Sequence, residues 1–215
     1  MFGPETLTFQ EFIMQEQLPL AVLQKAILQF LRHRNDVVVF GAQAVNAYVD
    51  EPRMTQDIDL LSPRAAELAR ELREYISQKF HIAVRIRTVG SGNGYRLYQV
   101  QKSGNRHLVD LRNVKELPPA QPIEDILVIS PADLIAGKVI SYYYRRGKPK
   151  AGTDWRDIAV LLLRFPELKS STNIVQEKLV KSGAGPEILA LWQEIAATDI
   201  TPEDDEDEFW GPTAG

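Results

Sequence analysis

Two aspartates, Asp57 and Asp59, have a spacing at which their carboxylates can hold a cation together. Residues 56–61 read QDIDLL, which predicts a strand, and side chains at positions i and i+2 of a strand point to the same face. Adjacent carboxylates repel each other unless a cation lies between them, and Mg²⁺ prefers oxygen ligands of this kind. We therefore interpret the pair as part of a metal site, although two solvent-facing acids on an exposed strand would give the same pattern.

A third aspartate, Asp110, lies in a later segment that alternates as a strand does. Residues 107–111 read HLVDL, so Asp110 points away from its two apolar neighbours. If this strand lies beside the strand of Asp57 and Asp59, the three carboxylates converge and can hold two metal ions about 3.5–4 Å apart. One ion would activate an attacking oxygen and the other would neutralise a leaving pyrophosphate, while Asp110 would help to deprotonate the acceptor.

Two small residues, Gly41 and Ala42, join an apolar segment, residues 37–40, to a segment of helix-forming composition, residues 42–49. This order predicts a buried strand that leads directly into a short helix. The backbone N–H groups at a helix N-terminus bind phosphate, and small residues let the phosphate approach closely. We therefore expect a phosphate cradle at this step.

The elements that must position these residues follow from apolar periodicity and turn signals. Helices are predicted at residues 19–33 and 64–80, and an antiparallel meander at residues 82–89, 95–101 and 107–111. Ser130, followed by Pro131 and Asp133, predicts the start of a helix that ends near residue 146, and further helices are predicted at residues 153–165, 172–182 and 186–197. We expect an α/β core with N-terminal helices at residues 1–128, a helical region at 129–200 and an acidic tail at 201–215.

The composition narrows the class of protein and the kind of site. The 215 residues include no cysteine, which excludes disulfides, thiolate catalysis and Cys-based zinc sites. The N-terminal segment lacks the pattern of a signal peptide, and no segment approaches the ~20 apolar residues that span a bilayer. We therefore expect a soluble, cytoplasmic protein without a membrane partner.

The charge is distributed unevenly along the chain. Residues 203–208 are six consecutive acids, and without them the net charge of −4 becomes +2. Such a run is typical of a solvated tail, although it would also suit a mimic of nucleic acid that folds back over a basic groove. Basic residues gather on the predicted meander and would form either a path for RNA or an ordinary solvated sheet face: Arg85, Arg87, Arg96, Lys102, Arg106 and Arg112.

The order of these motifs resembles a known superfamily. Gly41-Ala42, a short helix and then Arg53-x-Thr55-x-Asp57-Ile58-Asp59 look like the signature of polymerase β-like nucleotidyltransferases, most similar to the AbiEii/AbiGii toxin-like group. Downstream, residues 134–138 (LIAGK) resemble the lysine-bearing helix of that group, and residues 154–161 (DWRDIAVL) resemble its Asp-x-x-Asp helix. The resemblance covers about residues 37–165. Ala42 stands where that group has Gly or Ser, so a hydroxyl that could touch phosphate is absent.

The resemblance implies a nucleotidyltransferase-type mixed sheet flanked by helices and a Mg²⁺-dependent enzyme, with Mn²⁺ as the substitute ion. The reaction would move a nucleoside monophosphate from an NTP to a hydroxyl of RNA such as tRNA, of a protein or of a small molecule. A toxin–antitoxin or phage-defence setting, with a protein partner, is implied as well. Asp57, Asp59 and Asp110 would bind metal, and Gly41 and Ala42 would cradle the β- and γ-phosphates.

The resemblance further assigns nucleotide binding to Arg53, Thr55, Lys138 and Asp157, and a catalytic role to Lys138. The residues themselves leave other interpretations open. Arg53 would equally suit a salt bridge that fixes its loop, Thr55 a turn, and Lys138 a lysine that extends along the surface to reach water. Asp157 would orient Lys138 or Arg145, or serve the structure only.

Two other functions fit the same motifs. Because Ala42 lacks the hydroxyl, the chain could be a catalytically weak relative that binds nucleotide or RNA, or an antitoxin-like partner module. A scaffold protein whose acidic tail and Trp210 bind a partner is a third hypothesis. Release of pyrophosphate separates the first of these alternatives from an active transferase.

Overall fold

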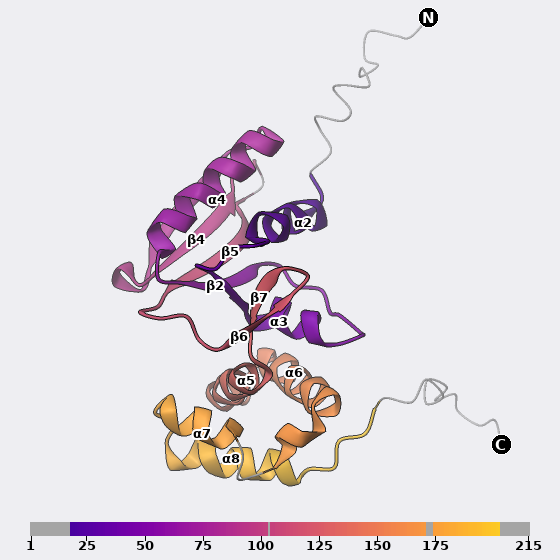
Figure 1. Ribbon diagram of the computed structural model, residues 1–215. Helices are drawn as coiled ribbons and strands as arrows, with labels where there is room; N and C mark the ends of the chain where they lie inside the picture. Colours follow the sequence, from indigo (N-terminus) through magenta and orange to yellow (C-terminus); the bar gives the residue numbers. More distant parts are fainter. Residues whose placement is uncertain (1–17, 103, 171–173, 203–215) are drawn as a thin grey trace, which may run out of the picture. The chain divides into compact units, whose positions relative to one another are not determined.

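The computed structural model describes residues 18–102, 104–170 and 174–202, which divide into two compact units (Figure 1). The first unit comprises residues 18–37, 55–117 and 124–126 of the described chain, and the second comprises residues 38–54, 118–123 and 127–202. The expected boundary between residues 128 and 129 stays a prediction. The acidic run at residues 203–208 and Trp210 lie outside the described residues.

The first unit contains four strands in the order β3-β4-β5-β2. Their bounds are β2 (Ile58–Ser62), β3 (Val84–Val89), β4 (Gly94–Gln99) and β5 (Arg106–Asn113). A short 3₁₀ turn, η1 (Gly90–Gly92), joins β3 to β4. As the meander predicts, β3, β4 and β5 are antiparallel neighbours, whereas β2 pairs with β5 in parallel.

Helices α2 (Leu20–Leu31) and α4 (Ala65–Phe80) cover one face of these strands (Figure 1). Leu68, Leu72 and Ile76 of α4 are fully buried, and Ile58 and Leu60 of β2 are fully buried as well. Because strand residues alternate between faces, the residues between these apolar positions point away from α4. The core of the first unit therefore leaves the opposite sheet face to polar side chains.

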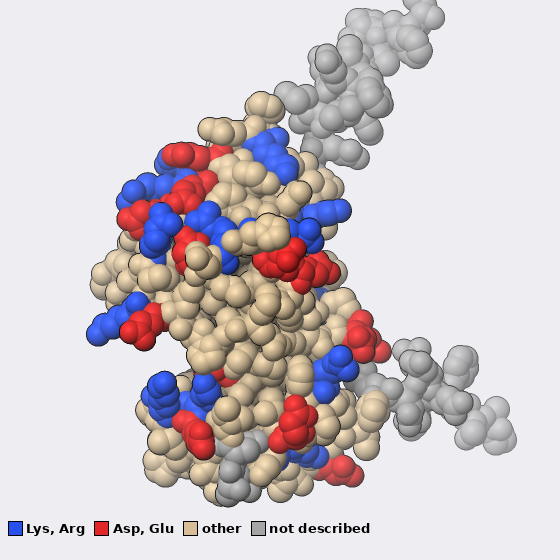
Figure 2. All heavy atoms as spheres, in the orientation of Figure 1, with Lys and Arg blue, Asp and Glu red and all other residues tan. Residues whose placement is uncertain are grey.

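The outer side of α4 carries charges of both signs, which lie side by side over this part of the surface (Figure 2). Glu71 forms ion pairs with Arg34 at 2.9 Å and with Arg64 at 3.1 Å. These pairs are partly exposed, so they contribute little to stability.

The second unit contains three strands in the order β1-β7-β6. They are β1 (Val38–Phe40), β6 (Ala120–Ile123) and β7 (Ile126–Ile129), and Val39 pairs with Val128 in parallel. Strands β6 and β7 are not among the elements that the sequence predicts. Each has four residues, and an apolar run as short as residues 126–129 does not distinguish a strand from a buried helical segment.

Five helices and one 3₁₀ turn complete the second unit. They are α3 (Gly41–Tyr48), α5 (Pro131–Arg145), α6 (Lys150–Arg164), η2 (Pro166–Lys169), α7 (Ile174–Lys181) and α8 (Pro186–Ala197). Helix α5 begins as predicted, since the Ser130 hydroxyl accepts a hydrogen bond from the Asp133 N–H at 3.2 Å. The predicted mixed α/β fold with a helical C-terminal region is confirmed. No helix in the described part of the chain is long and apolar enough to cross a membrane.

Candidate active site

The three predicted metal-binding aspartates lie on one face of the first unit, which we call the carboxylate face and define by Asp57, Asp59 and Asp110. Strand β5 lies beside β2, as convergence requires, and Asp59 is the register partner of Asp110. Asp57 directly precedes β2, and it shares a face with Asp59 because Ile58 between them is fully buried on the other side. Asp57 and Asp59 are partly exposed, whereas Asp110 is nearly buried.

A bulge in β5 brings a histidine to the same face. Arg96 pairs with Asp110 and Tyr98 pairs with His107, and the register shifts between Leu97 and Tyr98. The extra residue on β5 turns His107 toward the face of Asp110, although strict alternation would place residues 107 and 110 on opposite faces. As a result, His107 Nδ1 lies 2.9 Å from Asp57 Oδ2.

Asp57 and Asp110 each lie against a basic side chain. Besides its contact with Asp57, the His107 ring stacks on Tyr98 at a centroid distance of 4.9 Å, and its Nε2 lies 3.1 Å from the Val109 carbonyl oxygen. The hydrogen bond to Asp57 raises the pKa of His107, which outweighs the opposing effect of burial. Arg96 Nε donates to Asp110 at 3.1 Å, and the negative charge of Asp110 raises the pKa of Arg96. The geometry thus keeps the Asp110 carboxylate oriented.

The donor set of the carboxylate face suits Mg²⁺. Asp57 and Asp59 share one face of β2 and its preceding residue, and Mg²⁺ sites typically use one or two carboxylates together with substrate phosphates. Among the residues that the structure describes, there is no cluster of three or more His, Cys, Asp or Glu that could hold a metal ion.

Thr55 serves the turn that leads into β2. Its hydroxyl donates to the Asp57 carbonyl oxygen at 2.9 Å, and its own carbonyl accepts a hydrogen bond from Gln24 Nε2 at 2.9 Å. These contacts match the interpretation of Thr55 as a turn residue. They fix the backbone directly before the two aspartates.

The predicted phosphate cradle has the backbone conformation that requires glycine. Gly41 is the first residue of α3 and has φ = +70°, a region that is strained for residues with a side chain. Ala42 follows in the first turn, where backbone N–H groups have no partner within the helix. The predicted role of Gly41 and Ala42 depends on these N–H groups.

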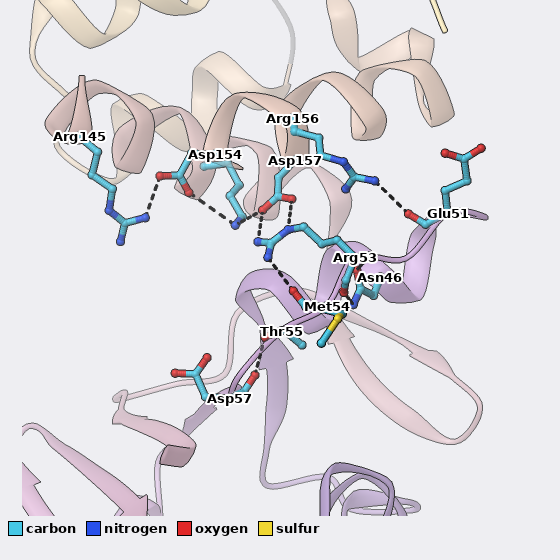
Figure 3. A network of polar contacts seen from close by, with 11 residues as sticks. Asn46, Glu51, Arg53, Met54, Thr55, Asp57, Arg145, Asp154, Arg156 and Asp157 are labelled. Atoms are coloured by element: carbon cyan, nitrogen blue, oxygen red, sulfur yellow. Dashed lines mark hydrogen bonds and ion pairs between the residues drawn. The ribbon is translucent and has the colours of Figure 1, made fainter. Parts of the chain in front are cut away.

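The remaining predicted residues form a network in the second unit, which we call the charge chain and define by Arg53, Asp157, Lys138, Asp154 and Arg145 (Figure 3). Arg53 holds Asp157 through two hydrogen bonds, each of 2.8 Å, and Lys138 donates to the same carboxylate. Lys138 also lies 3.7 Å from Asp154, which accepts a hydrogen bond of 2.7 Å from Arg145. Cations and anions therefore alternate along the chain.

The centre of the charge chain is buried. The Asp157 side chain is 0% exposed and Lys138 is 8% exposed, so Lys138 is not a lysine that extends along the surface to reach water. Burial alone raises the pKa of Asp157, but the hydrogen bonds from Arg53 and the charge of Lys138 outweigh it and hold this pKa below its usual range. Asp157 orients Lys138 and Arg53, whereas Arg145 pairs with Asp154.

Arg53 also fixes the segment between α3 and β2. Its backbone carbonyl accepts from Asn46 Nδ2 at 2.8 Å, and its N–H donates to Asn46 Oδ1 at 3.0 Å (Figure 3). Arg156 Nη2 donates to the Glu51 carbonyl oxygen at 3.3 Å. The salt-bridge interpretation of Arg53 thus matches its contacts.

The structure distributes the predicted site residues over the two units. The first unit contains Thr55, Asp57, Asp59 and Asp110, and the second contains Gly41, Ala42, Arg53, Lys138 and Asp157. The sequence did not point to His107, because its local pattern gives no signal of the bulge. It did not point to Asn46 either, because a helix side chain that bonds the backbone of a following loop has no distinctive spacing.

Several solved structures share this fold. The polyadenylate synthase of Megavirus is 16% identical with a TM-score of 0.56, covering 68% of this chain, and the chain spans 32% of that protein. A nucleotidyltransferase from H. pylori described as putative is 14% identical with a TM-score of 0.51, covering 88% of this chain and 94% of that one. JHP933 from Helicobacter pylori is 13% identical with a TM-score of 0.50, and the match covers 89% of this chain and 92% of that one. At these identities the likeness shows the fold alone.

No curated protein matches the chain. A family model described as "Nucleotidyl transferase AbiEii toxin, Type IV TA system" matches residues 22–210, which is most of the sequence. The match includes both the carboxylate face and the charge chain. The chain therefore belongs to the AbiEii nucleotidyl transferase toxin family of type IV toxin–antitoxin systems.

Proposed function

We propose that the protein is a Mg²⁺-dependent enzyme that transfers a nucleoside monophosphate from an NTP to an acceptor hydroxyl. The observation that carries the proposal is the pairing of Asp59 with Asp110 across parallel strands, with Asp57 on the same face. Mn²⁺ would substitute for Mg²⁺. An antitoxin, as the family's description suggests, would be the protein partner.

On this proposal, Asp57 and Asp59 would hold the ion together with the triphosphate, and Asp110 would act as the general base. When bound, the ion would neutralise charge on the leaving pyrophosphate. The acceptor oxygen attacks the α-phosphorus, the bond to the β-phosphate oxygen breaks, and the acceptor proton passes to Asp110. Arg96 supports this role, because its hydrogen bond holds the Asp110 carboxylate in position.

Taken by itself, the second unit offers groups that would bind phosphate. Gly41 and Ala42 offer backbone N–H groups, and the charge chain has three cations against two anions, which leaves one net positive charge for a phosphate. Arg53, whose side chain is 22% exposed, is better placed to meet a ligand than buried Lys138. We propose that Lys138 and Asp157 act mainly by holding Arg53 in position.

The polar residues of the first unit favour a nucleic acid as the acceptor over a protein or a small molecule. Two cross-strand rows share the carboxylate face: Arg87, Arg96, Asp110 and Asp59, and Arg85, Tyr98 and His107. Arginines neutralise phosphates, and stacked rings such as Tyr98 and His107 offer a platform for a base. An RNA end would present a phosphate and a base next to its terminal hydroxyl.

Labelling tests the proposal. The purified chain is incubated with each α-³²P-labelled NTP, Mg²⁺, and total cellular RNA and protein, and the labelled product is identified by ribonuclease or protease digestion. We expect the wild-type chain to label RNA and to release a matching amount of pyrophosphate. We expect Asp57→Ala and Asp59→Ala to give no labelled RNA and no pyrophosphate. Glu116→Ala, an exposed acid of the same unit, is the matched control and should behave as wild type.

The catalytically weak alternative predicts a different result. A relative without turnover, for which Ala42 is the argument, would bind NTP and release no pyrophosphate with any acceptor. That outcome, with a folded protein and a broad acceptor screen, would overturn the proposed transfer.

A further inference from the structure

We propose that the turn between α5 and α6 is a binding surface for RNA, which shares Arg145 with the charge chain and otherwise consists of residues that have no assigned role in chemistry. We call it the basic turn and define it as residues 143–150 (YYRRGKPK). It contains four cations, and no acid occurs anywhere between residues 134 and 153. The nearest acid in sequence on the α6 side is Asp154, which belongs to the charge chain.

Most of the positive charge of the basic turn is not neutralised. Arg145 pairs with Asp154 at 2.7 Å, so its charge is compensated. Arg146, Lys148 and Lys150 are exposed, and none of them forms an ion pair with another residue in the described ranges. Three such charges within five residues suit a polyanion, because each can neutralise a phosphate.

The basic turn also presents aromatic rings to solvent. Tyr144 is 68% exposed and meets Tyr143 edge to face at a centroid distance of 5.3 Å. The Arg146 guanidinium lies 4.5 Å from the centre of the Tyr143 ring. Exposed ring faces beside cations suit a nucleic acid, because bases stack on the rings while phosphates meet the charges. Apart from the tyrosines the turn offers no large apolar side chain, which disfavours insertion into a membrane.

The backbone of the basic turn is well defined, so little order is lost when a ligand binds. Gly147 has φ = +77°, a conformation that favours glycine, and Pro149 restricts the next step. The Lys148 N–H donates to the Arg145 carbonyl at 2.9 Å, and the Ala151 N–H donates to the Lys148 carbonyl at 2.9 Å. A turn whose backbone is fixed before binding loses less conformational entropy on binding than a mobile loop does.

This inference rests on the proposed function only for the idea that the bound RNA is the acceptor. Binding to the basic turn requires neither NTP nor metal. A failure of nucleotide transfer would therefore leave the binding result intact, and the reverse holds as well.

The test is fluorescence anisotropy of a labelled single-stranded RNA oligonucleotide with the full chain, without NTP or Mg²⁺, over a range of salt concentrations. Arg146→Glu/Lys148→Glu/Lys150→Glu should weaken binding at least tenfold and lower the slope of log Kd against log salt by about two, since each single-strand phosphate contact contributes ~0.7. Tyr144→Ala should weaken binding about fivefold or more with an unchanged salt slope. Circular dichroism checks that each variant is folded.

The matched control carries the same change of charge at three exposed lysines elsewhere: Lys25→Glu, Lys115→Glu and Lys181→Glu. It should bind RNA within about threefold of wild type, because nearby contacts and not net charge dominate at physiological salt. The inference would be overturned if the control lost as much RNA affinity as the triple variant. It would also be overturned if the triple variant bound RNA as tightly as wild type. A triple variant that keeps RNA binding but no longer binds phosphatidylserine vesicles would assign the surface to membranes and also overturn it.

Discussion

The carboxylate face of the first unit and the charge chain of the second use the same residue types but differ in how far they are buried. On the carboxylate face, the side chain of Asp57 is 31% exposed and that of Asp110 is 13% exposed, and Arg96, which pairs with Asp110, is 43% exposed. In the charge chain, those of Asp154 and Asp157 are 3% and 0% exposed. Exposed carboxylates can exchange a basic neighbour for a ligand, whereas buried ones are committed to their partners. We therefore expect changes on the face to lower activity and changes in the chain to lower stability first.

The largest effect is expected when the centre of the charge chain is removed. Asp157→Leu leaves Lys138 and Arg53 without their shared carboxylate, and loss of one partner from a buried ion pair costs about 3–5 kcal/mol. Urea unfolding followed by circular dichroism measures the difference in free energy of unfolding.

The double variant Lys138→Met/Asp157→Leu is the matched control for that measurement. It removes the buried cation together with its partner, so it should be clearly more stable than Asp157→Leu alone. If Asp157→Leu stays within about 1 kcal/mol of wild type, the charge chain is not a structural element and the comparison fails.

A change on the carboxylate face should separate activity from stability. Asp110→Asn removes the proposed general base and should lower kcat about 10²–10³-fold. Arg96 is 43% exposed and remains hydrated without its partner, so the free energy of unfolding should change by no more than about 1 kcal/mol. Rates of pyrophosphate release and urea midpoints on the same preparations provide both numbers. If Asp110→Asn lowered the free energy of unfolding by several kcal/mol as well as kcat, the carboxylate face would not differ from the charge chain in the way proposed.

Acid should weaken the protein through the charge chain. The pKa of Asp157 is lower in the folded protein than in the unfolded chain, so its contribution to stability is complete above the unfolded pKa of about 3.9 and is lost as the pH falls through the folded pKa. Unfolding free energies measured from pH 6 downward should therefore decline below about pH 4. In Asp157→Asn the decline over that interval should be shallower, and an unchanged slope would argue against a depressed pKa.

The smallest effect is expected at the phosphate cradle. Ala42→Ser restores a hydroxyl at the start of α3, and one further hydrogen bond to phosphate would lower the KM for NTP about twofold to tenfold. Ala47→Ser, on the exposed side of the same helix, should leave the KM unchanged. A larger KM for Ala42→Ser would show that this step does not face the nucleotide.

Much of the fold follows from local sequence patterns. Gly41 predicts the step from strand to helix, because few residues other than glycine adopt its positive φ. Ser130 predicts the start of α5, because the capping residue and the first turn are adjacent in sequence. The alternation around Ile58 predicts that Asp57 and Asp59 share a face. Such features depend on residues a few positions apart, so the sequence contains the whole signal.

Other features depend on residues far apart in sequence. Arg53 and Asp157 are 104 positions apart, so the sequence leaves open whether Arg53 binds phosphate or a carboxylate. His107 reaches Asp57 only because of a bulge in the pairing of β4 with β5, which is set by both strands together. Neither contact has a local signature, and both needed the tertiary structure.

The most direct test of the account is the Mg²⁺-dependent release of pyrophosphate by Asp59→Asn, measured beside its free energy of unfolding. We expect a rate lower by about 10³-fold, because a lost metal ligand removes several kcal/mol of charge stabilisation in the transition state. We expect a free energy of unfolding within about 1 kcal/mol of wild type, because Asp59 is partly exposed. Turnover within tenfold of wild type by the folded variant would contradict the assignment of the carboxylate face as the catalytic centre.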